Sequence, residues 1–257
     1  MAELPDLTVF AKILTKRFQG KVLETLDVSV AKKIKVTGTA LKKALEGREL
    51  LNVEREGKTL QLIFSGSQVL GLHLMLRGEL VLFDQDEPPR YQILGFHFEG
   101  GEAFSLVDLQ KHATPTLNPE KIAVPDALDL QEKDFLDLLA RKRTTIKTLL
   151  MDQHLIRGIG NSYSDEILYQ AGISPLSIAK AIPANHAKKL FKSIGETLRT
   201  AIEQIAKENG NELKGELRDF MHVHRSSMEK TDKGEKILST KIGGRKSYYT
   251  AEQQLFK

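Results

Sequence analysis

The hydrophobic pattern changes its period once along the chain, and this change limits the folds that are possible. Within residues 21–107, apolar residues alternate with other residues in several runs, which is typical of strands with one buried face. Beyond residue 130, apolar residues recur at the spacing of amphipathic helices. Thr114–Asp126 lies between these patterns, contains three prolines and is typical of a linker. The chain therefore predicts an α+β protein with two domains.

The strand-rich half begins with one predicted helix. Gly20 is a typical helix stop, and it follows a set of residues at helical spacing: Leu4, Leu7, Phe10, Ala11, Leu14 and Phe18. Burial of this helix would fix the N-terminus against the core. A short helix is predicted near Ala40–Leu45, and Gly100-Gly101 predicts a hairpin. One strand alternates an apolar face, Leu70, Leu72, Leu74 and Leu76, with a second face, Gly71, His73, Met75 and Arg77.

The helical half ends in a predicted hairpin. Phe135–Leu139 and Ile146–Leu150 predict helices, and a long amphipathic helix is predicted to end at Gly210. Residues 235–250 have the pattern of a small hairpin. We therefore expect a strand-rich domain at 1–113, a linker at 114–129, a helical domain at 130–221 and a hairpin tail at 222–257.

The positive charge is concentrated in the second half of the chain. The formal net charge is +4, but Arg141–Asn161 has five basic residues and one acid, and His222–Lys257 has eight basic residues and four acids. This distribution favours a polyanion such as nucleic acid as the partner. Ordinary solvated lysine and arginine faces are the alternative interpretation.

The composition also excludes several classes of protein. No run approaches the roughly 18 apolar residues of a membrane span, and the N-terminus lacks a signal pattern. We therefore expect a cytoplasmic protein with no membrane partner. The chain has no cysteine, which excludes disulfides and thiolate metal sites.

One glycine-rich stretch carries the strongest local signal, "RGIGNSYSDEILYQAGISP" at Arg157–Pro175. Gly158 and Gly160 bracket a tight turn, and Asn161 or Ser162 can cap the helix that follows. A glycine turn at a helix N-terminus exposes backbone N–H groups that bind phosphate. A helix–turn–helix without any ligand is the alternative.

This stretch resembles the helix–two-turn–helix motif of the formamidopyrimidine-DNA glycosylase / endonuclease VIII family. The residues that carry the resemblance are Ile159-Gly160-Asn161, Tyr163, Asp165-Glu166, Ala171-Gly172-Ile173 and Pro175. Three further segments agree in order. "MAELPDL" is similar to the N-terminal Pro-Glu-Leu-Pro-Glu of the family, "VEREGKTLQLIF" with "LGLHLMLRGEL" to its central strands, and "IGGRKSYYTAEQQ" to the end of its zinc finger. The resemblance covers residues 2–254.

The resemblance implies a two-domain fold, with an N-terminal β-sandwich behind a leading helix and a C-terminal helix–two-turn–helix domain with a β-hairpin finger. It implies a DNA glycosylase with AP-lyase activity in base excision repair. A damaged base is flipped into a pocket, and the N-terminal amine forms a Schiff base with the sugar. An α-amino group suits this step because its reference pKa is about 7.7–8.0.

Site residues are carried over by position. Ala2 would be the nucleophile once Met1 is removed, Glu3 would be the general acid and base, and Lys58 would contact phosphate beside the lesion. DNA would also be bound by Gly160 and Asn161 at the turn and by Arg245 and Lys246 of the hairpin, with Pro5 and Glu166 as structural residues. Met75 is expected to be either the wedge that fills the space left by the base or a core residue.

Several positions depart from the family pattern. Ala2 replaces the nucleophilic Pro, Asp6 replaces a Glu, and Thr8 stands where the family typically has Glu. The family's Asp-Pro-Arg-Arg-Phe-Gly becomes Asp108-Leu109-Gln110-Lys111-His112-Ala113, so Gln110 would face the orphaned base and His112 would stack. All four zinc cysteines are absent, with Thr250 and Gln253 at or near the last pair. We expect a zincless finger, no metal and no cofactor.

Three functions are compared on these residues. The first is the active glycosylase and AP lyase, acting on damaged or abasic double-stranded DNA as a nucleoid-associated monomer. The second is a catalytically inactive protein that recognises abasic or distorted DNA, which would account for Ala2 and the altered wedge. The third, an RNA-binding protein, is disfavoured because the tail hairpin also matches. The sequence does not specify which damaged base is recognised. In the family it resembles, a flexible loop contacts the flipped base, and we expect this loop around Asn209–Arg218.

Overall fold

The computed structural model describes residues 1–257 except 31–33, 35 and 85–86. The chain divides into two compact units, which are described separately. The first contains residues 1–122 and 205–216, and the second contains residues 123–204 and 217–257. None of the described helices is long and apolar enough to cross a membrane.

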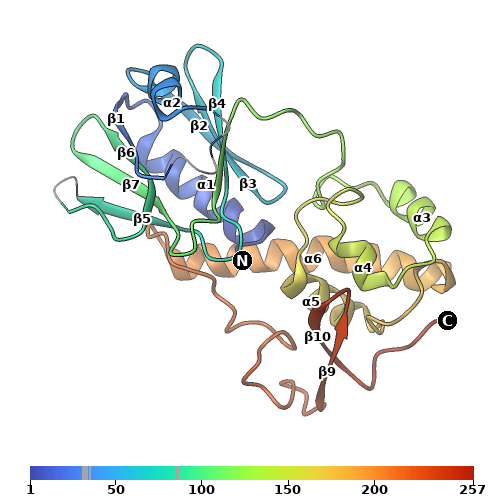
Figure 1. The fold of residues 1–257 in the computed structure, drawn as a ribbon. Coiled ribbons are helices and arrows are strands. Elements are labelled where there is room, and N and C mark those ends of the chain that lie inside the picture. The colour runs from blue at the N-terminus through green and yellow to red at the C-terminus, as the bar shows by residue number, and fades with distance from the viewer. Residues whose placement is uncertain (31–33, 35, 85–86) are drawn as a thin grey trace. The chain divides into compact units, whose positions relative to one another are not determined.

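The first unit is a β-sandwich of two antiparallel four-stranded sheets (Figure 1). One sheet has the order β1-β6-β7-β5, formed by Leu23–Val28, Gln92–Phe98, Glu102–Val107 and Glu79–Asp84. The other has the order β2-β3-β4-β8, formed by Leu50–Glu56, Thr59–Phe64, Gln68–His73 and Thr114–Leu117. Gly100 and Gly101 have φ of 85° and 83° in the β6–β7 turn, so the predicted hairpin is confirmed.

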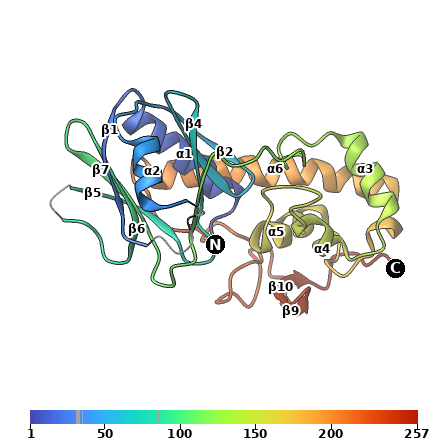
Figure 2. The same ribbon diagram turned by 45° about the horizontal axis from the view of Figure 1, so that its top comes forward.

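The leading helix and both sheets share one core. Helix α1, Leu4–Phe18, contacts β2 and β3, and Figure 2 shows it beside β2. The Phe18 ring packs against Phe98 and Phe104, and Phe104 stacks on Phe96 with 4.5 Å between ring centroids. Each fully buried phenylalanine contributes about 1.5–3 kcal/mol. This burial explains why α1 and the N-terminus are held firmly.

Two local features differ from the sequence-based expectations. Strand β4 ends at His73, and the chain turns so that the backbone N–H of Gly78 donates to the Leu74 carbonyl at 2.9 Å. Leu76 is therefore 57% exposed instead of sharing the buried face. Strand β8 lies inside the stretch expected to be a linker. Among the described strands, β8 pairs with β4 alone, at the sheet edge, where Pro115 is tolerated.

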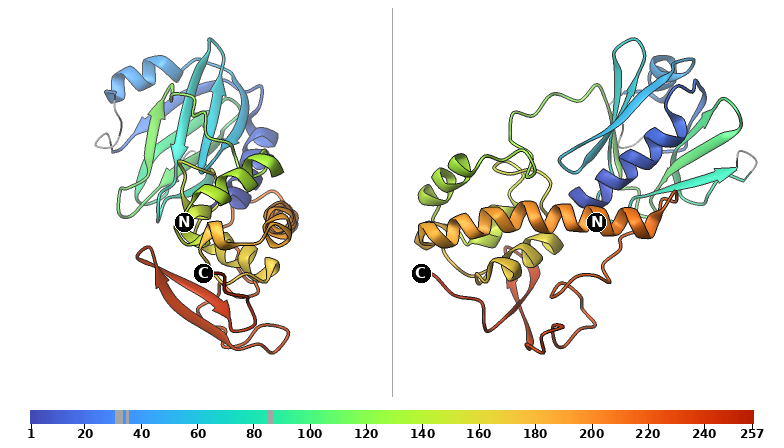
Figure 3. Two further views of the ribbon diagram at one scale, coloured as in Figure 1. Left: turned by 90° about the vertical axis from the view of Figure 1, so that its right-hand side faces the viewer. Right: turned by 180° about the vertical axis from the view of Figure 1, so that it is seen from behind.

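The second unit contains the helices beyond residue 130 and the C-terminal hairpin (Figure 3). Gly172 ends α5 with φ of 73°, the left-handed conformation that glycine favours. Helix α2, Gly38–Leu45, belongs to the first unit, as do residues 205–209 of α6. The other elements are α3 Glu132–Arg141, α4 Ile146–Met151, α5 Asn161–Ala171, η1 Ala179–Ala181, α6 Ala184–Asn209, β9 Ile237–Ile242 and β10 Arg245–Thr250.

The glycine turn before α5 forms without a side-chain cap. The sequence predicted Asn161 or Ser162 as the N-cap, but the N-cap is Gly160, in extended conformation. Asn161 is instead the first helical residue. Its side chain extends toward the hairpin because β10 packs against α5.

Candidate active site and nucleic-acid interface

The N-terminal residues are held by the first turn of α1. Glu3 is the N-cap and is only 2% exposed, and its backbone N–H donates to Asp6 Oδ2 at 2.9 Å. Asp6 thus serves as a short capping residue where the family has Glu. Pro5 lies in the first turn, where a missing N–H is tolerated. Ala2 is fixed beside this cap.

A cavity of about 570 Å³ opens beside this N-terminus. Met1 and Ala2 line it on one side, and the turn that follows β4 lines another. Residues 212–216 complete the lining, and the amine of Met1 forms an ion pair with Glu216. The loop expected from the sequence to contact a flipped base therefore borders the N-terminal cavity. Polar groups in its lining include Arg77, Glu79, Glu212, Lys214 and Glu216.

Lys58 lies at the tip of the β2–β3 hairpin. Gly57, with φ of 59°, allows the two-residue turn between Glu56 and Thr59. Arg55 fixes this turn, because its Nη1 donates to the Gly57 carbonyl at 3.1 Å and its Nε to Thr8 Oγ1 at 2.9 Å. Arg55 thus connects the Lys58 turn to α1, the helix that carries Glu3.

His73 lies beside Lys58 and was not assigned a role from the sequence. It pairs with Thr59 across the β3–β4 ladder, and its Nδ1 accepts a hydrogen bond from the Met75 backbone N–H at 3.0 Å. Burial lowers the pKa of His73, and the charge of Lys58 lowers it further. The imidazole is therefore kept neutral, with its proton on Nε2. Two sequence signals pointed to it: its position opposite the leucine face, and its place in the segment "LGLHLMLRGEL" that resembles the family.

Gln110 and His112 are exposed on a loop that Asp108 holds. The Asp108 carboxylate accepts hydrogen bonds from the backbone N–H groups of Gln110, His112 and Ala113. This Asx-type turn keeps both side chains on the surface. From the sequence, Asp108 was named only as part of the segment Asp108–Ala113 and was given no role. Its type, at the end of a strand and before a loop, is the signal that could have identified it.

The expected wedge lies in the turn after β4. Met75 is 38% exposed, with φ of 56°, and its neighbour Leu76 is the more exposed of the two. Leu76 lines the N-terminal cavity, whereas Met75 is absent from the described lining. The interpretation of Met75 as a core residue is therefore wrong, because its side chain leaves the protein interior. Leu76 is a second candidate that the sequence analysis missed.

In the second unit, the glycine turn and the hairpin meet at Asn161. Its Nδ2 donates to the Lys246 carbonyl at 3.0 Å, and its Oδ1 is buried without a hydrogen-bond partner among the described residues. Arg245 and Lys246 are exposed at the start of β10. The Lys246 amine lies 4.8 Å from the Tyr248 ring centroid, a cation–π contact. Cationic groups and a helix N-terminus therefore lie together, which suits phosphate.

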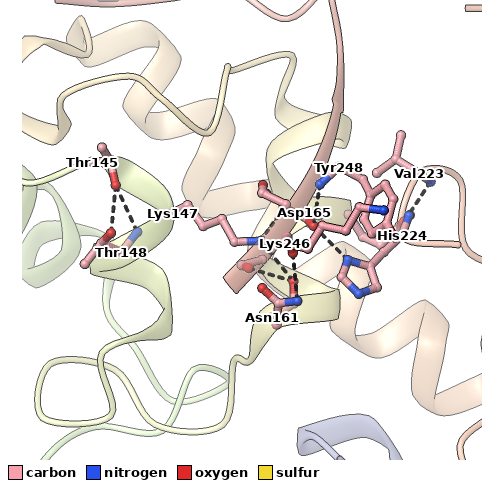
Figure 4. Close-up of polar contacts among 12 residues, drawn as sticks. Thr145, Lys147, Thr148, Asn161, Asp165, Val223, His224, Lys246 and Tyr248 are labelled. Atoms are coloured by element: carbon pink, nitrogen blue, oxygen red, sulfur yellow. Dashed lines mark hydrogen bonds and ion pairs between the residues drawn. The ribbon is translucent and has the colours of Figure 1, made fainter. Parts of the chain in front are cut away.

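Two adjacent carboxylates of α5, Asp165 and Glu166, hold the chain around the hairpin, and Figure 4 labels Asp165. Glu166 accepts hydrogen bonds from the backbone N–H groups of His222, Val223 and His224, each at 2.8 Å. Asp165 binds groups of α4, β10 and His224. Glu166 therefore holds three successive backbone N–H groups of the segment that precedes the hairpin.

Hydrogen bonds occupy the positions where the resemblance places the last zinc ligands. Thr250 N donates to Gln253 Oε1, and Gln253 Nε2 donates to the Ile173 carbonyl, both at 2.8 Å. Tyr169 closes the other end of the finger by donating to Glu235 at 2.7 Å. Burial and this hydrogen bond raise the pKa of Tyr169, which keeps the donor proton in place. Within the part of the chain that is described, no cluster of three His, Asp or Glu residues could hold a metal.

Comparison with known proteins matches both halves of the chain. Residues 1–114 match the formamidopyrimidine-DNA glycosylase N-terminal domain, and residues 122–211 match the formamidopyrimidine-DNA glycosylase H2TH domain. A formamidopyrimidine-DNA glycosylase of Pelotomaculum thermopropionicum is 28% identical over 276 aligned positions, with 100% of both chains covered. That of Lactobacillus gasseri is 30% identical over 220 positions, which cover 79% of this chain and 78% of the relative.

Solved structures agree with the same assignment. The complex of Lactococcus lactis Fpg with DNA containing an abasic site has a TM-score of 0.88 and 25% identity, and covers 98% of this chain and 99% of that one. Its complex with FAPY-dG-containing DNA has a TM-score of 0.89. The fold and these matches define a DNA-binding glycosylase of base excision repair. Within that class, the chain belongs to the formamidopyrimidine-DNA glycosylase family.

Proposed function

We propose that the chain removes damaged bases from double-stranded DNA with the amine of Ala2 as its nucleophile, after Met1 has been removed. The observation that carries this proposal is the N-terminus itself. Ala2 lines a cavity large enough for a nucleobase, and the buried Glu3 follows it at the N-cap of α1. The cavity also has polar side chains that can bind the edge of a flipped base.

The reaction uses a primary amine in place of the family's proline. The neutral Ala2 nitrogen attacks C1′ of the sugar, a new C–N bond forms, and the bond from C1′ to the base breaks as the base gains a proton. The C1′–O4′ bond of the sugar then breaks as O4′ gains a proton, which opens the ring, and loss of a proton from nitrogen leaves the Schiff base between nitrogen and C1′. Glu3 exchanges these protons, and elimination then cleaves the strand at the abasic site. A primary amine can complete each of these steps.

The remaining site residues are proposed to hold the DNA. Lys58 binds a phosphate beside the lesion, with His73 Nε2–H as a second donor next to it. The turn at Met75 and Leu76 enters the space left by the base, and Leu76 extends furthest. Gln110 pairs with the orphaned base while His112 stacks.

In the second unit, Gly160, Asn161, Arg245 and Lys246 are proposed to bind backbone phosphate. The finger that carries the two basic residues is proposed to be zincless. The absence of cysteine and the hydrogen bonds of Thr250 and Gln253 support this proposal. The side-chain amide of Gln253 and the backbone N–H of Thr250 here take the place of ligands that tetrahedral zinc requires.

Borohydride trapping on DNA with an abasic site tests the nucleophile. We expect a covalent adduct on chains that lack Met1, confirmed by the intact mass of the same preparation. Glu3→Gln should abolish the adduct, and Glu24→Gln, an exposed carboxylate of β1, is the matched control. Tight binding without an adduct in processed chains would favour the alternative function, a silent protein that recognises abasic or distorted DNA.

The working form is proposed to be a monomer at the nucleoid in the cytoplasm. Each unit presents its own set of DNA contacts within one chain. Light scattering of the free protein and of its complex with a short duplex tests this. A complex with two protein copies per duplex would contradict it.

A further inference from the structure

His224 makes a buried contact that the proposed chemistry does not use. Its Nδ1 lies 2.7 Å from Asp165 Oδ2, and its side chain is 16% exposed. Because the carboxylate oxygen is the acceptor, Nδ1 carries the proton. His222 lies two residues before His224 in the sequence. In the structure, they lie in different environments.

Asp165 is the point where three segments of the second unit converge (Figure 4). Its Oδ1 accepts from Lys147 Nζ of α4 at 2.5 Å and from Ser247 Oγ of β10 at 2.6 Å. Its Oδ2 accepts from the Tyr248 backbone N–H of β10 at 2.9 Å and from His224. The carboxylate is almost fully buried, so losing any one donor is costly.

The hairpin depends on such a contact for its placement. Strands β9 and β10 form a two-stranded sheet, which is marginally stable alone. Two of the Asp165 contacts come from β10, at the residues that follow Arg245 and Lys246 along the strand. The Tyr248 ring, which lies under the Lys246 amine, also packs edge-on against His224 with 5.1 Å between centroids.

We propose that His224 is a positioning residue, which with Asp165 locks the finger hairpin onto α5 and so sets Arg245 and Lys246 for phosphate binding. This inference rests on the proposed phosphate contacts of the finger. In a zincless finger, the hydrogen bond between His224 and Asp165 holds the hairpin in place, as a bound metal would otherwise do. His224 acts only through β10 and does not itself touch the DNA.

Three variants separate positioning from simple loss of fold. His224→Ala removes the donor but leaves the buried pair of Lys147 and Asp165 intact. His224→Asn restores a donor near the position of Nδ1. His222→Ala is the matched control, because its side chain is half exposed and it keeps the backbone N–H that binds Glu166.

Two measurements are made on the full-length protein. The first is hydrogen exchange of the Tyr248 N–H, which reports the contact without DNA. The second is the salt dependence of binding to a duplex with a tetrahydrofuran abasic analogue. We expect His224→Ala to speed exchange by at least about tenfold. We also expect it to weaken binding about tenfold and to reduce the salt slope by roughly one phosphate contact. Wild-type values are expected for His224→Asn and His222→Ala.

A double-mutant comparison with Arg245→Ala completes the test. If His224 acts through the hairpin, Arg245→Ala should cost less affinity in the His224→Ala background than alone. Unchanged Tyr248 exchange, or additive losses of affinity, would overturn the proposal. If Arg245→Ala alone leaves binding unchanged, the proposed phosphate contact of Arg245 is wrong, whatever His224 does for the hairpin. Tyr248 exchange still identifies which of the two proposals failed, because it does not involve DNA.

Discussion

The Asp108 carboxylate accepts a hydrogen bond from the backbone N–H of His112 at 2.7 Å. The N–H groups of Gln110 and Ala113 bind the same carboxylate at 2.8 Å. Burial raises the pKa of Asp108, but the three hydrogen bonds together lower it more, so its pKa lies below the ordinary value. One buried anion thus holds the loop that exposes two proposed DNA contacts.

We expect Asp108→Asn to lower the free energy of unfolding at pH 7 by about 1–3 kcal/mol, because the anion that accepts three N–H bonds is lost. The folded pKa lies below the unfolded value near 3.8. The contribution is therefore complete above that value and is lost as the pH falls through the folded pKa. Urea unfolding from pH 3 to 7 measures this, with the exposed Asp84→Asn as control. Equal acid sensitivity in wild type and Asp108→Asn would contradict it.

His73 adds a pH dependence in the same direction. Its folded pKa is below the reference value of 6.5, so the unfolded chain binds more protons as the pH falls. The stability from neutral His73 is complete above about 6.5 and is lost as the pH falls through the folded pKa. Lys58→Met should raise the pKa of His73 in an NMR titration, whereas Lys241→Met, on the hairpin, should not. An unchanged pKa of His73 in Lys58→Met would show that the charge of Lys58 does not lower it.

Gly78→Ala should destabilise the turn that carries Met75 and Leu76. A Cβ built on Gly78 would lie 2.2 Å from the Leu74 carbonyl oxygen and 3.1 Å from Ala113 Cβ, so backbone has to move. We expect a loss of about 1–3 kcal/mol in the free energy of unfolding, measured by urea denaturation. Gly215→Ala is the control, because its Cβ would meet nothing within 4 Å. Equal stabilities would show that the turn adapts freely.

Leu76→Ala should slow base excision more than Met75→Ala does. A wedge offsets part of the unstacking cost of a few kcal/mol, so we expect a decrease of roughly tenfold in single-turnover rate for Leu76→Ala. Met75 is less exposed and is not in the described cavity lining, so a smaller decrease is expected for it. Unfolding midpoints control for stability. A larger effect at Met75 would restore it as the main wedge.

Arg245→Ala and Asn161→Ala should weaken binding to every duplex sequence. Phosphate contacts carry no base information, and each contributes roughly one unit to the salt slope. Binding measured from 50 to 200 mM salt should therefore be flatter for Arg245→Ala. The exposed Lys188→Ala, on α6, is the control for general loss of charge. A salt dependence of Arg245→Ala equal to that of wild type would show that Arg245 does not contact a DNA phosphate.

The sequence predicted the elements whose signals are local. The spacing of Leu4 to Phe18 with Gly20 predicted α1, and Gly100-Gly101 predicted the β6–β7 turn. Lys58 was assigned only by its resemblance to the family, and the structure places it in the turn between β2 and β3. Leu76 was misassigned because alternation continues in the sequence after the strand has ended.

The long-range arrangement was decided only by the tertiary structure. The donors on Asp165 lie 18, 59, 82 and 83 residues away along the chain, beyond any local period. The same holds for residues 205–216, which join the first unit although they follow helices of the second. A local pattern determines which face of a segment is buried, because it reflects the backbone period. The partner for each buried carboxylate depends on which segments pack together.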